Sequence, residues 1–378
     1  MLDACSGTAD MSNLRGLAQF DQSPWLDNLR RSWLTGREIT GWIERGVRGI
    51  TSNPSIFQKA IEDSSDYDAQ FAELLGAGAG VDDAYWRMVS DDISAAAALL
   101  APVYRASGGT DGFVSVEVDP RLAHDQVGTE AAARALDDRL AAPNLLVKVP
   151  ATVEGVAAVE NLVAEGRSIN VTLIFSLDRY RAVMEAYIAG LERFAAAGGD
   201  LAGVASVASF FISRVDTEVD RRLEAIATPG ALALRGTAAL TQARCAYRDH
   251  LATFSGARWE SLAARGAQPQ RPLWASTSTK NPAYPDTLYV DALIGPGTVN
   301  TIPDATLMAF EDHGTLARTL DADLDAASAT WASITAAVDM HDVAEVLERE
   351  GVAAFATAHA AVLAALTAKA HGLDPSRF

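Results

Sequence analysis

The chain has 378 residues, 49% of them hydrophobic and 21% charged, and this composition predicts a globular protein rather than a disordered or fibrous one. Its formal net charge is −18, which argues against nucleic acid and anionic membranes as partners, because both present phosphates. Small phosphorylated substrates are compatible with this charge, but they would require a local cationic pocket on an acidic protein.

The N-terminus and the cysteines indicate a cytoplasmic protein. The sequence does not determine the oligomeric state, and we expect a monomer or a homodimer. Residues 1–20 lack the basic segment and apolar core of a secretory signal, and we expect them to form a flexible lead-in to one domain over residues 21–378. No apolar run is expected to approach the ~20 residues that cross a bilayer, so no membrane contact is predicted. Cys5 and Cys245 lie far apart in the sequence and predict no disulfide framework.

Short apolar runs alternate with longer helical patterns along the chain. The first helical pattern, residues 35–46, has a threonine start and a glycine stop, and the second begins at residue 53 with a proline in its first turn. Further helical patterns cover residues 66–108, 216–266 and 323–370, and in the last of these one helix is predicted to end at Gly351. Strands are predicted over residues 23–29, 47–51, 112–119, 144–151, 168–176, 204–213, 271–276 and 298–303.

Eight strands alternating with helices are typical of a single (β/α)8 barrel, the TIM barrel, here with extra helices after the second and sixth strands. A doubly wound open sheet is the competing architecture. No glycine-rich dinucleotide fingerprint follows the first strand, so this alternative has little support. We therefore predict one α/β barrel domain.

Single polar residues interrupt the apolar runs near the strand ends, which is where the active sites of such barrels lie. Because several strands end at the same face of a barrel, these side chains can meet in one pocket. They are Asp27, Asn53, Glu117, Lys148, Asn170, Thr172, Ser209 and Ser276.

Lys148 lies in the otherwise apolar run "NLLVKVPAT". Alone, it could be a lysine whose stem is buried and whose ammonium reaches water. Burial would disfavour the charged form, and a neutral amine can attack a carbonyl and form a Schiff base. Asp27 and Glu117 could supply the general acid and base, although each could also be a structural carboxylate.

The histidines support neither of two other enzyme classes. None lies at a strand end beside a carboxylate and a nucleophile, as a Ser-His-Asp triad requires. The six histidines are scattered, without the spacing of metal ligands, so no metal site is predicted.

Five motifs resemble, in order, the strand motifs of transaldolases, which belong to the class I Schiff-base aldolases: "GITSNPSI", "SVEVDPRLAHD", "LLVKVPAT", "INVTLIFS" and "SFFISRVD". The resemblance runs from about Asp27 to about Pro303, and "STKNPAYPD" is most similar to the longer bacterial transaldolases. It implies a single barrel without metal or organic cofactor. It also implies sugar-phosphate substrates, between which a dihydroxyacetone unit is transferred in the non-oxidative pentose phosphate pathway.

The resemblance assigns catalytic roles to four residues. Lys148 matches the Schiff-base lysine, and Asp27 matches the general acid/base that acts on a substrate hydroxyl. Glu117 matches a glutamate that acts through a water, which the hydroxyl of Thr172 helps to hold.

The remaining matches concern substrate binding. Asn53 and Asn170 match residues that bind the dihydroxyacetone hydroxyls, and Ser209 and Arg214 match a phosphate-binding pair. Arg214 also has a plain alternative, since it could pair with Asp216 or Glu218 on a helix surface.

The seventh strand departs from the family pattern. Shorter relatives have an arginine soon after this strand, whereas this chain has Ser276, Ser278 and Lys280. Lys280 could take the second phosphate contact, and it is also the rival nucleophile. Its polar loop would keep it hydrated and protonated, which favours Lys148.

Two alternative functions stay open. A Schiff-base aldolase, similar to fructose 6-phosphate aldolase, would release free dihydroxyacetone instead of transferring it. A barrel that binds sugar phosphates without turnover would need no buried amine, so Lys148 argues against it.

Overall fold

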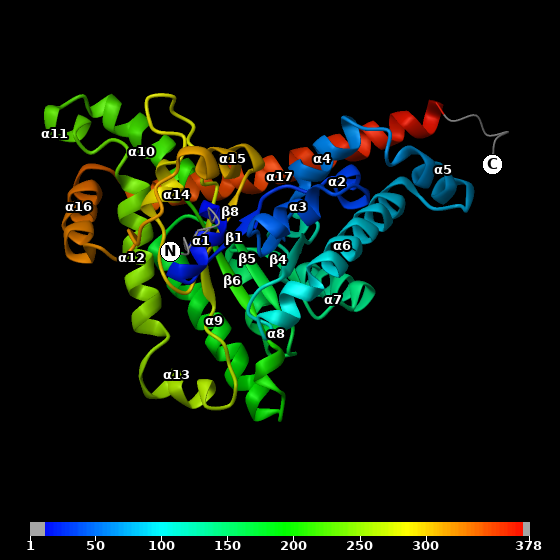
Figure 1. The fold of residues 1–378 in the computed structure, drawn as a ribbon, viewed down its shortest axis with the longest axis horizontal. Helices are drawn as coiled ribbons and strands as arrows, with labels where there is room; N and C mark the ends of the chain where they lie inside the picture. Colours follow the sequence, from blue (N-terminus) through cyan, green and yellow to red (C-terminus); the bar gives the residue numbers. More distant parts are fainter. Residues whose placement is uncertain (1–11, 373–378) are drawn as a thin grey trace, which may run out of the picture.

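A computed structural model describes residues 12–372, and its eight strands close into one parallel barrel (Figure 1). Each strand pairs with the next along the chain, and β8 pairs with β1. The predicted (β/α)8 barrel is confirmed. The strands are β1 (Gln22–Leu26), β2 (Gly49–Thr51), β3 (Phe113–Glu117), β4 (Leu145–Pro150), β5 (Ile169–Ile174), β6 (Ser206–Phe211), β7 (Arg271–Ala275) and β8 (Thr298–Ile302).

Helices surround this barrel, and extra helices follow β2 and β6 as predicted. The first half of the chain contributes α1 (Asn13–Gly16), α2 (Arg31–Thr35), α3 (Glu38–Arg45), α4 (Pro54–Glu62), α5 (Asp68–Gly76), α6 (Val81–Ala106), α7 (Gln126–Leu140), α8 (Val153–Val163) and α9 (Leu177–Ala196). The second half contributes α10 (Ser213–Ile226), α11 (Pro229–Leu232), α12 (Ala238–Thr253), α13 (Gly256–Ala263), α14 (Leu288–Ala292), α15 (Asp304–His313), α16 (Leu324–Ala337) and α17 (Met340–Gly372).

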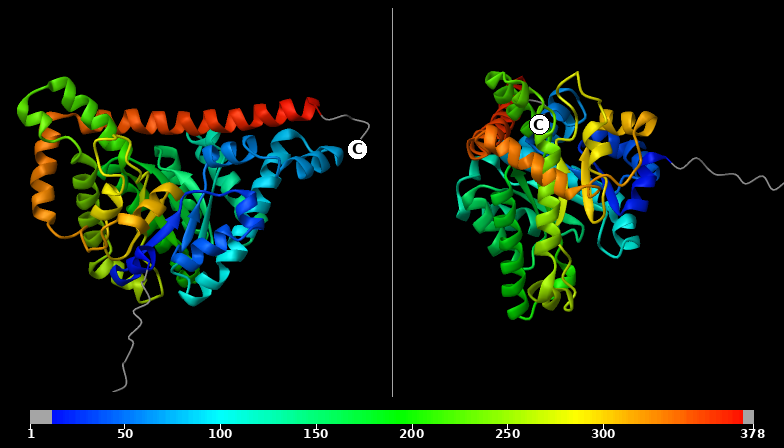
Figure 2. Two further views of the ribbon diagram at one scale, coloured as in Figure 1. Left: turned by 45° about the horizontal axis from the view of Figure 1, so that its top comes forward. Right: turned by 90° about the vertical axis from the view of Figure 1, so that its left-hand side faces the viewer.

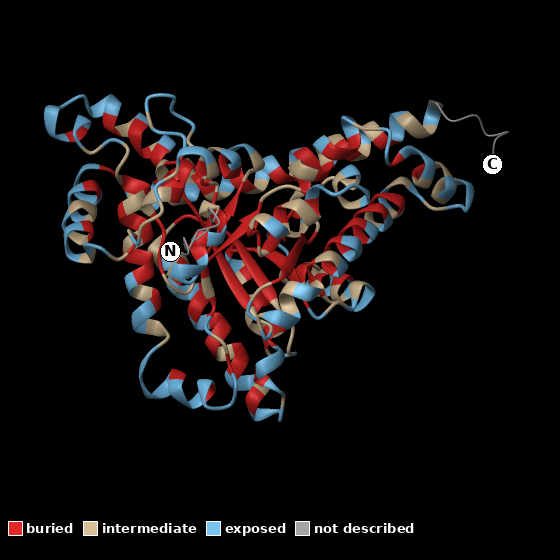
Figure 3. Ribbon diagram, viewed as in Figure 1, coloured by how far each residue is buried: buried red, intermediate tan, exposed pale blue. Residues whose placement is uncertain are grey.

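The strands are buried on both faces, since one face fills the barrel and the other packs against helices (Figure 3). This double burial explains why their sequences are nearly continuous apolar runs rather than alternating patterns. The register places polar residues of adjacent strands side by side. Lys148 of β4 is level with Glu117 of β3 and with Asn170 of β5.

The long helix α17 lies across one end of the barrel (Figure 2). Its apolar side is buried, and ion pairs hold its two ends: Asp342 pairs with Arg222 of α10 at 2.6 Å, and Lys369 pairs with Asp68 of α5 at 2.6 Å. The helix predicted to end at Gly351 continues to Gly372. Alanine-rich sequence after Gly351 favours helix.

Gly351 also lets α17 approach the barrel closely. A Cβ atom at this position would lie 3.0 Å from Leu173 of β5, a tight contact, and 3.6 Å from Arg214. The glycine is therefore explained by packing, which overrides its usual tendency to end a helix.

Among the described helices, α17 alone has the length and hydropathy of a membrane span, over Met340–His371. The expectation that no apolar run reaches this length was wrong. Large apolar residues of α17, including Val343, Leu347, Phe355 and Val362, are buried against the rest of the protein. Packing on the barrel thus accounts for the apolar character of this helix.

Two boundaries near the N-terminus differ from the predictions. Residues 1–11 of the expected lead-in lie outside the described part, but residues 13–20 form two short helices in which Leu14 and Leu17 are buried. The helix predicted from Thr35 begins at Glu38, and it ends at Gly46 as predicted, where φ is 126°. Of the two cysteines, Cys245 is buried with a free thiol, and Cys5 lies outside the described residues.

Candidate active site

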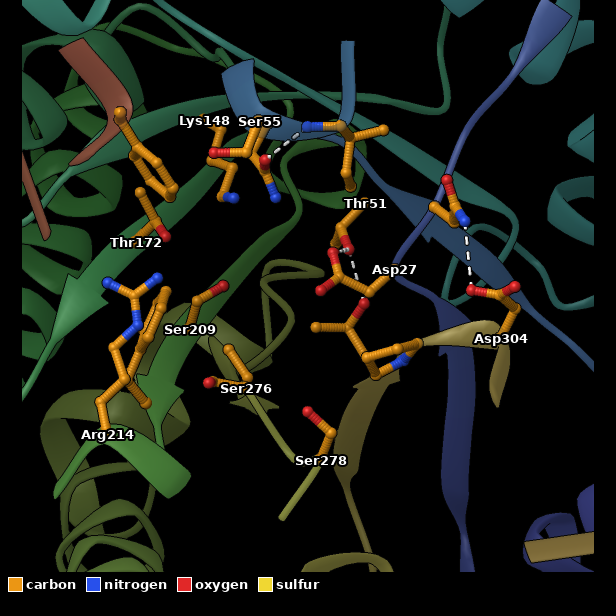
Figure 4. Close-up of a pocket in the computed structure, with 18 of the residues that line it drawn as sticks. Asp27, Thr51, Ser55, Lys148, Thr172, Ser209, Arg214, Ser276, Ser278 and Asp304 are labelled. Atoms are coloured by element: carbon orange, nitrogen blue, oxygen red, sulfur yellow. Dashed lines mark hydrogen bonds between the residues drawn. The ribbon is translucent and has the colours of Figure 1, made fainter. Parts of the chain in front are cut away.

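A cavity of about 400 Å³ opens where the strands end (Figure 4). It is lined by Asp27, which follows β1, by residues of β2 and of β4 to β8, and by the helices α4, α10, α15 and α17. Two of the predicted site residues, Glu117 and Asn170, do not line it. The predicted residues that do are Asp27, Asn53, Lys148, Thr172, Ser209, Arg214, Ser276 and Lys280.

Lys148 points into this cavity from β4, with only 6% of its side chain exposed. Its Nζ lies 3.3 Å from Oε2 of Glu117, donates to the carbonyl of Ser52 at 3.4 Å, and sits 5.7 Å from the ring centroid of Phe355. The amine is buried as predicted, but a carboxylate is its immediate neighbour.

Glu117 is the natural proton partner of this amine. Burial raises its pKa, while the nearby Lys148 opposes that rise. Transfer of one proton from Lys148 to Glu117 would leave both groups neutral, which burial favours. Such a transfer within the pair would make the amine nucleophilic.

Glu117 also borders a second, small cavity behind Lys148, of about 10 Å³, close to the smallest volume that holds one water. Oε2 of Glu117 lies near Lys148 but without the geometry of a hydrogen bond. The buried Oγ1 of Thr172 likewise has no hydrogen-bond partner among residues 12–372. Both oxygens are therefore available to a water or a substrate hydroxyl.

Asp27 follows β1 and faces the same cavity as Lys148 (Figure 4). Its Oδ1 accepts a hydrogen bond from Thr51 at 2.8 Å, and Thr51 in turn contacts Thr301 of β8. Enclosure by the protein raises the pKa of Asp27, and Lys148 and Thr51 oppose this rise. A carboxyl group with a raised pKa is suited to exchange protons with a substrate near neutral pH.

The two predicted asparagines have different surroundings. Asn53 lines the cavity and caps α4, because its Oδ1 accepts a hydrogen bond from the amide of Ile56 at 3.0 Å. Asn170 is fully buried: it donates to Ser115 at 2.9 Å and accepts from Ser209 at 2.7 Å. The structure thus places Asn170 behind Ser209, which it positions, rather than in the cavity wall.

Arg214 lies in the first turn of α10, and its guanidinium stacks at 5.1 Å from the ring centroid of Phe211. The alternative that it pairs with Asp216 or Glu218 is wrong. Asp216 binds the amide of Ala239 and the hydroxyl of Tyr289, and Glu218 pairs with Arg221 and Arg222. Arg214 forms no ion pair with any residue between 12 and 372, so its charge is directed to the cavity.

The segment after β7 supplies the other polar wall. Ser276 has a positive φ of 58°, which is uncommon outside glycine, and its hydroxyl lies 2.9 Å from that of Ser213. Lys280 is exposed and donates to Ser278 at 2.8 Å. Lys148 is the buried amine and has a carboxyl group as its neighbour, so the structure favours it over the exposed Lys280 as the nucleophile.

The charged residues of the cavity are mainly cationic. Its lining includes five cations and two carboxylates, although the whole chain carries a net charge of −18. This is the local cationic pocket that a phosphorylated substrate requires. The cations are Arg30, Lys59, Lys148, Arg214 and Lys280, and the carboxylates are Asp27 and Asp304.

Buried Asp216 anchors the segment that carries Lys280. It accepts hydrogen bonds from Tyr289 at 2.9 Å and from the amide of Ala239 at 2.7 Å, while Asp220 accepts one from Tyr284 at 2.6 Å. These contacts tie α10 to the chain that follows Lys280. Burial raises the pKa of Asp216 to about 6.

The raised pKa of Asp216 predicts a specific pH dependence of stability. The pKa of Asp216 is higher in the folded state than in the unfolded state. Its contribution to the free energy of unfolding is therefore present at low pH and is lost as the pH rises through about 6. From pH 7.5 to pH 5, the free energy of unfolding should therefore rise by about 1.4 kcal/mol relative to Asp216→Asn. Urea denaturation of both proteins at both pH values measures this difference, and parallel pH profiles would contradict it.

A closed parallel barrel with a buried amine, two carboxyl groups and a cationic rim at its strand ends defines an enzyme of the aldol-chemistry class. The sequence matches the family described as transaldolase/fructose-6-phosphate aldolase over residues 24–366. The chain belongs to this family, which confirms the resemblance found in its motifs.

Three relatives, each named a transaldolase, illustrate the similarity. The protein from Thermobifida fusca is 52% identical over 91% of this chain and 94% of its own. Transaldolase 1 from Streptomyces coelicolor is 49% identical over 97% of both chains. The protein from Mycobacterium ulcerans is 53% identical over 80% of this chain and 82% of its own.

Proposed function

We propose that this enzyme is a transaldolase. It transfers a dihydroxyacetone unit from sedoheptulose 7-phosphate to glyceraldehyde 3-phosphate, giving erythrose 4-phosphate and fructose 6-phosphate. The names of the relatives support this reaction. The observation that carries the mechanism is the buried Nζ of Lys148, 3.3 Å from Glu117 and in the same cavity as Asp27.

The first half of the reaction forms a covalent intermediate. Neutral Lys148 attacks the C2 carbonyl of the ketose phosphate and gives a carbinolamine. Glu117, directly or through a water, donates the proton with which the hydroxyl leaves as water, and a protonated imine remains. Buried neighbours and hydrogen bonds around Lys148 hold the amine in position for this attack.

Carbon–carbon cleavage follows. Asp27 takes the proton of the C4 hydroxyl, the C3–C4 bond breaks, and its electron pair moves into the imine to give an enamine. The aldose phosphate leaves with a new carbonyl at its former C4. A second aldose phosphate then enters, and the same steps run in reverse, so atoms and charges balance over the cycle.

The rim of the cavity binds the phosphate ends of both substrates in this proposal. Arg214 can offer paired N–H donors to a phosphate, and Ser209, Ser276 and Lys280 supply further donors. We further propose that this reaction serves the non-oxidative pentose phosphate pathway in the cytoplasm, as expected from the sequence.

Borohydride reduction in the presence of fructose 6-phosphate tests the covalent step. We expect a reduced adduct on Lys148 in peptide mass maps, and an unmodified protein would favour a barrel that binds without turnover. In a separate assay without borohydride, fructose 6-phosphate and erythrose 4-phosphate together should yield sedoheptulose 7-phosphate. Release of free dihydroxyacetone without that product would instead indicate the aldolase alternative.

A further inference from the structure

Lysine is rare in this chain, and its distribution is uneven. Of 31 basic residues only four are lysines, at positions 59, 148, 280 and 369, and the remaining 27 are arginines. Three of the four, Lys59, Lys148 and Lys280, line the active-site cavity. Lys148 and Lys280 already have roles in the proposed reaction, whereas Lys59 has none.

Lys59 is an exposed residue of α4, the helix that begins beside the reactive amine. Ser55, one helical turn earlier on the same face, also lines the cavity. Side chains of a helix lean toward its N-terminus, so the ammonium of Lys59 is directed back over the cavity mouth.

The ammonium of Lys59 has no protein partner within residues 12–372. The other three lysines do: Lys148 contacts Glu117, Lys280 donates to Ser278, and Lys369 pairs with Asp68. Partial burial lowers the pKa of Lys280, and the nearby positive charges of Arg214 and Lys59 add to this lowering. Arg214 and Lys59 thus both lie near Lys280 in the lining of one cavity, and such like charges are unfavourable until an anion lies among them.

We propose that Lys59 is a third cation of the phosphate subsite and binds the phosphate end of the sugar substrates together with Arg214 and Lys280. This inference rests on the proposed function. The buried amine lies at the cavity floor and the exposed cations lie at its rim, which matches a ketose phosphate whose carbonyl and phosphate are at opposite ends. A lysine suits the rim, because its flexible stem can follow phosphates at different distances from the reacting carbon.

The test compares acceptors with and without a phosphate. In a ping-pong reaction, kcat/KM for the acceptor reports only the reaction of the acceptor with the enzyme that already carries the dihydroxyacetone unit. Fructose 6-phosphate can therefore serve as the donor in all of these measurements. With Lys59→Met, we expect kcat/KM for erythrose 4-phosphate to fall by about three- to tenfold, the range of one net hydrogen bond. The value for unphosphorylated erythrose should change by less than about twofold. Lys59→Arg keeps the charge and should restore most of the loss.

Lys369→Met is the matched control, because it removes the one lysine outside the cavity and should leave both acceptors unaffected. Equal losses for both acceptors in Lys59→Met, or no loss for erythrose 4-phosphate, would overturn the inference.

A binding measurement separates failure of this inference from failure of the proposed function. Inorganic phosphate should raise the melting temperature of the wild type more than that of Lys59→Met, at constant ionic strength set by chloride. If the wild type shows this stabilisation but transfers no dihydroxyacetone, the subsite stands and the transaldolase assignment fails. If it transfers dihydroxyacetone and phosphate stabilises both proteins equally, Lys59 is not part of the subsite.

Discussion

Replacing Lys148 with methionine is expected to abolish transfer, lowering kcat/KM for fructose 6-phosphate by on the order of 10⁴-fold or more. Methionine is close to lysine in length and packs well in apolar surroundings, so the barrel should still fold. It cannot form an imine, and no other buried amine among residues 12–372 lines the cavity. A coupled assay for glyceraldehyde 3-phosphate, the aldose phosphate that cleavage of fructose 6-phosphate releases, measures the loss, and borohydride should no longer label the protein.

Lys280→Met is the informative comparison, since this residue is the rival nucleophile. It should raise KM for phosphorylated substrates while borohydride still labels Lys148. If Lys148→Met retained turnover and Lys280→Met lost it, the roles of the two lysines would have to be exchanged.

Replacing Asp27 with asparagine is expected to lower kcat by about 10²- to 10⁴-fold, the usual contribution of a general acid or base. The Schiff base should still form, because Lys148 and Glu117 are unchanged. Borohydride trapping with fructose 6-phosphate should therefore succeed while glyceraldehyde 3-phosphate is released slowly. If Asp27→Asn cleaved fructose 6-phosphate rapidly, the carboxylate of Asp27 would have a structural role rather than a catalytic one.

The pH profile gives a second measure of Asp27. Cleavage requires the carboxylate form, so kcat should fall as the pH drops through the pKa of Asp27, which enclosure places above its ordinary value of 3.8. Thr51→Val removes the hydrogen bond that stabilises this carboxylate and should move the acid limb to still higher pH. An unchanged acid limb would assign it to another group.

The sequence was sufficient for the barrel because its strands are buried on both faces. Such strands read as apolar runs, and a single polar residue within or after each run marks the end where side chains converge. Asp27, Lys148 and Thr172 are predicted from this pattern, and all three line one cavity. The position of Asn170 behind Ser209 is not predictable in this way, because the two faces of a doubly buried strand look alike in sequence.

Other site residues depend on contacts that no local pattern shows. Phe355 reaches Lys148 only because α17 folds back over the barrel, and Thr51 supports Asp27 only because β1 and β2 are adjacent. Gly351 is predicted to end a helix, but in the structure it lies within α17 and allows close packing on Leu173. Lys59 had a usable signal, the scarcity of lysine in the chain.

The position of α17 in the chain has a consequence for biosynthesis. All eight strands are complete at Ile302, yet the aromatic wall beside Lys148 comes from Phe355, on the helix that follows α16. A polypeptide emerging from the ribosome can therefore assemble its sheet while the reactive amine is still open to bulk water. Limited proteolysis between α16 and α17 should reproduce that unfinished state, as a folded barrel in which borohydride labelling with fructose 6-phosphate is lost.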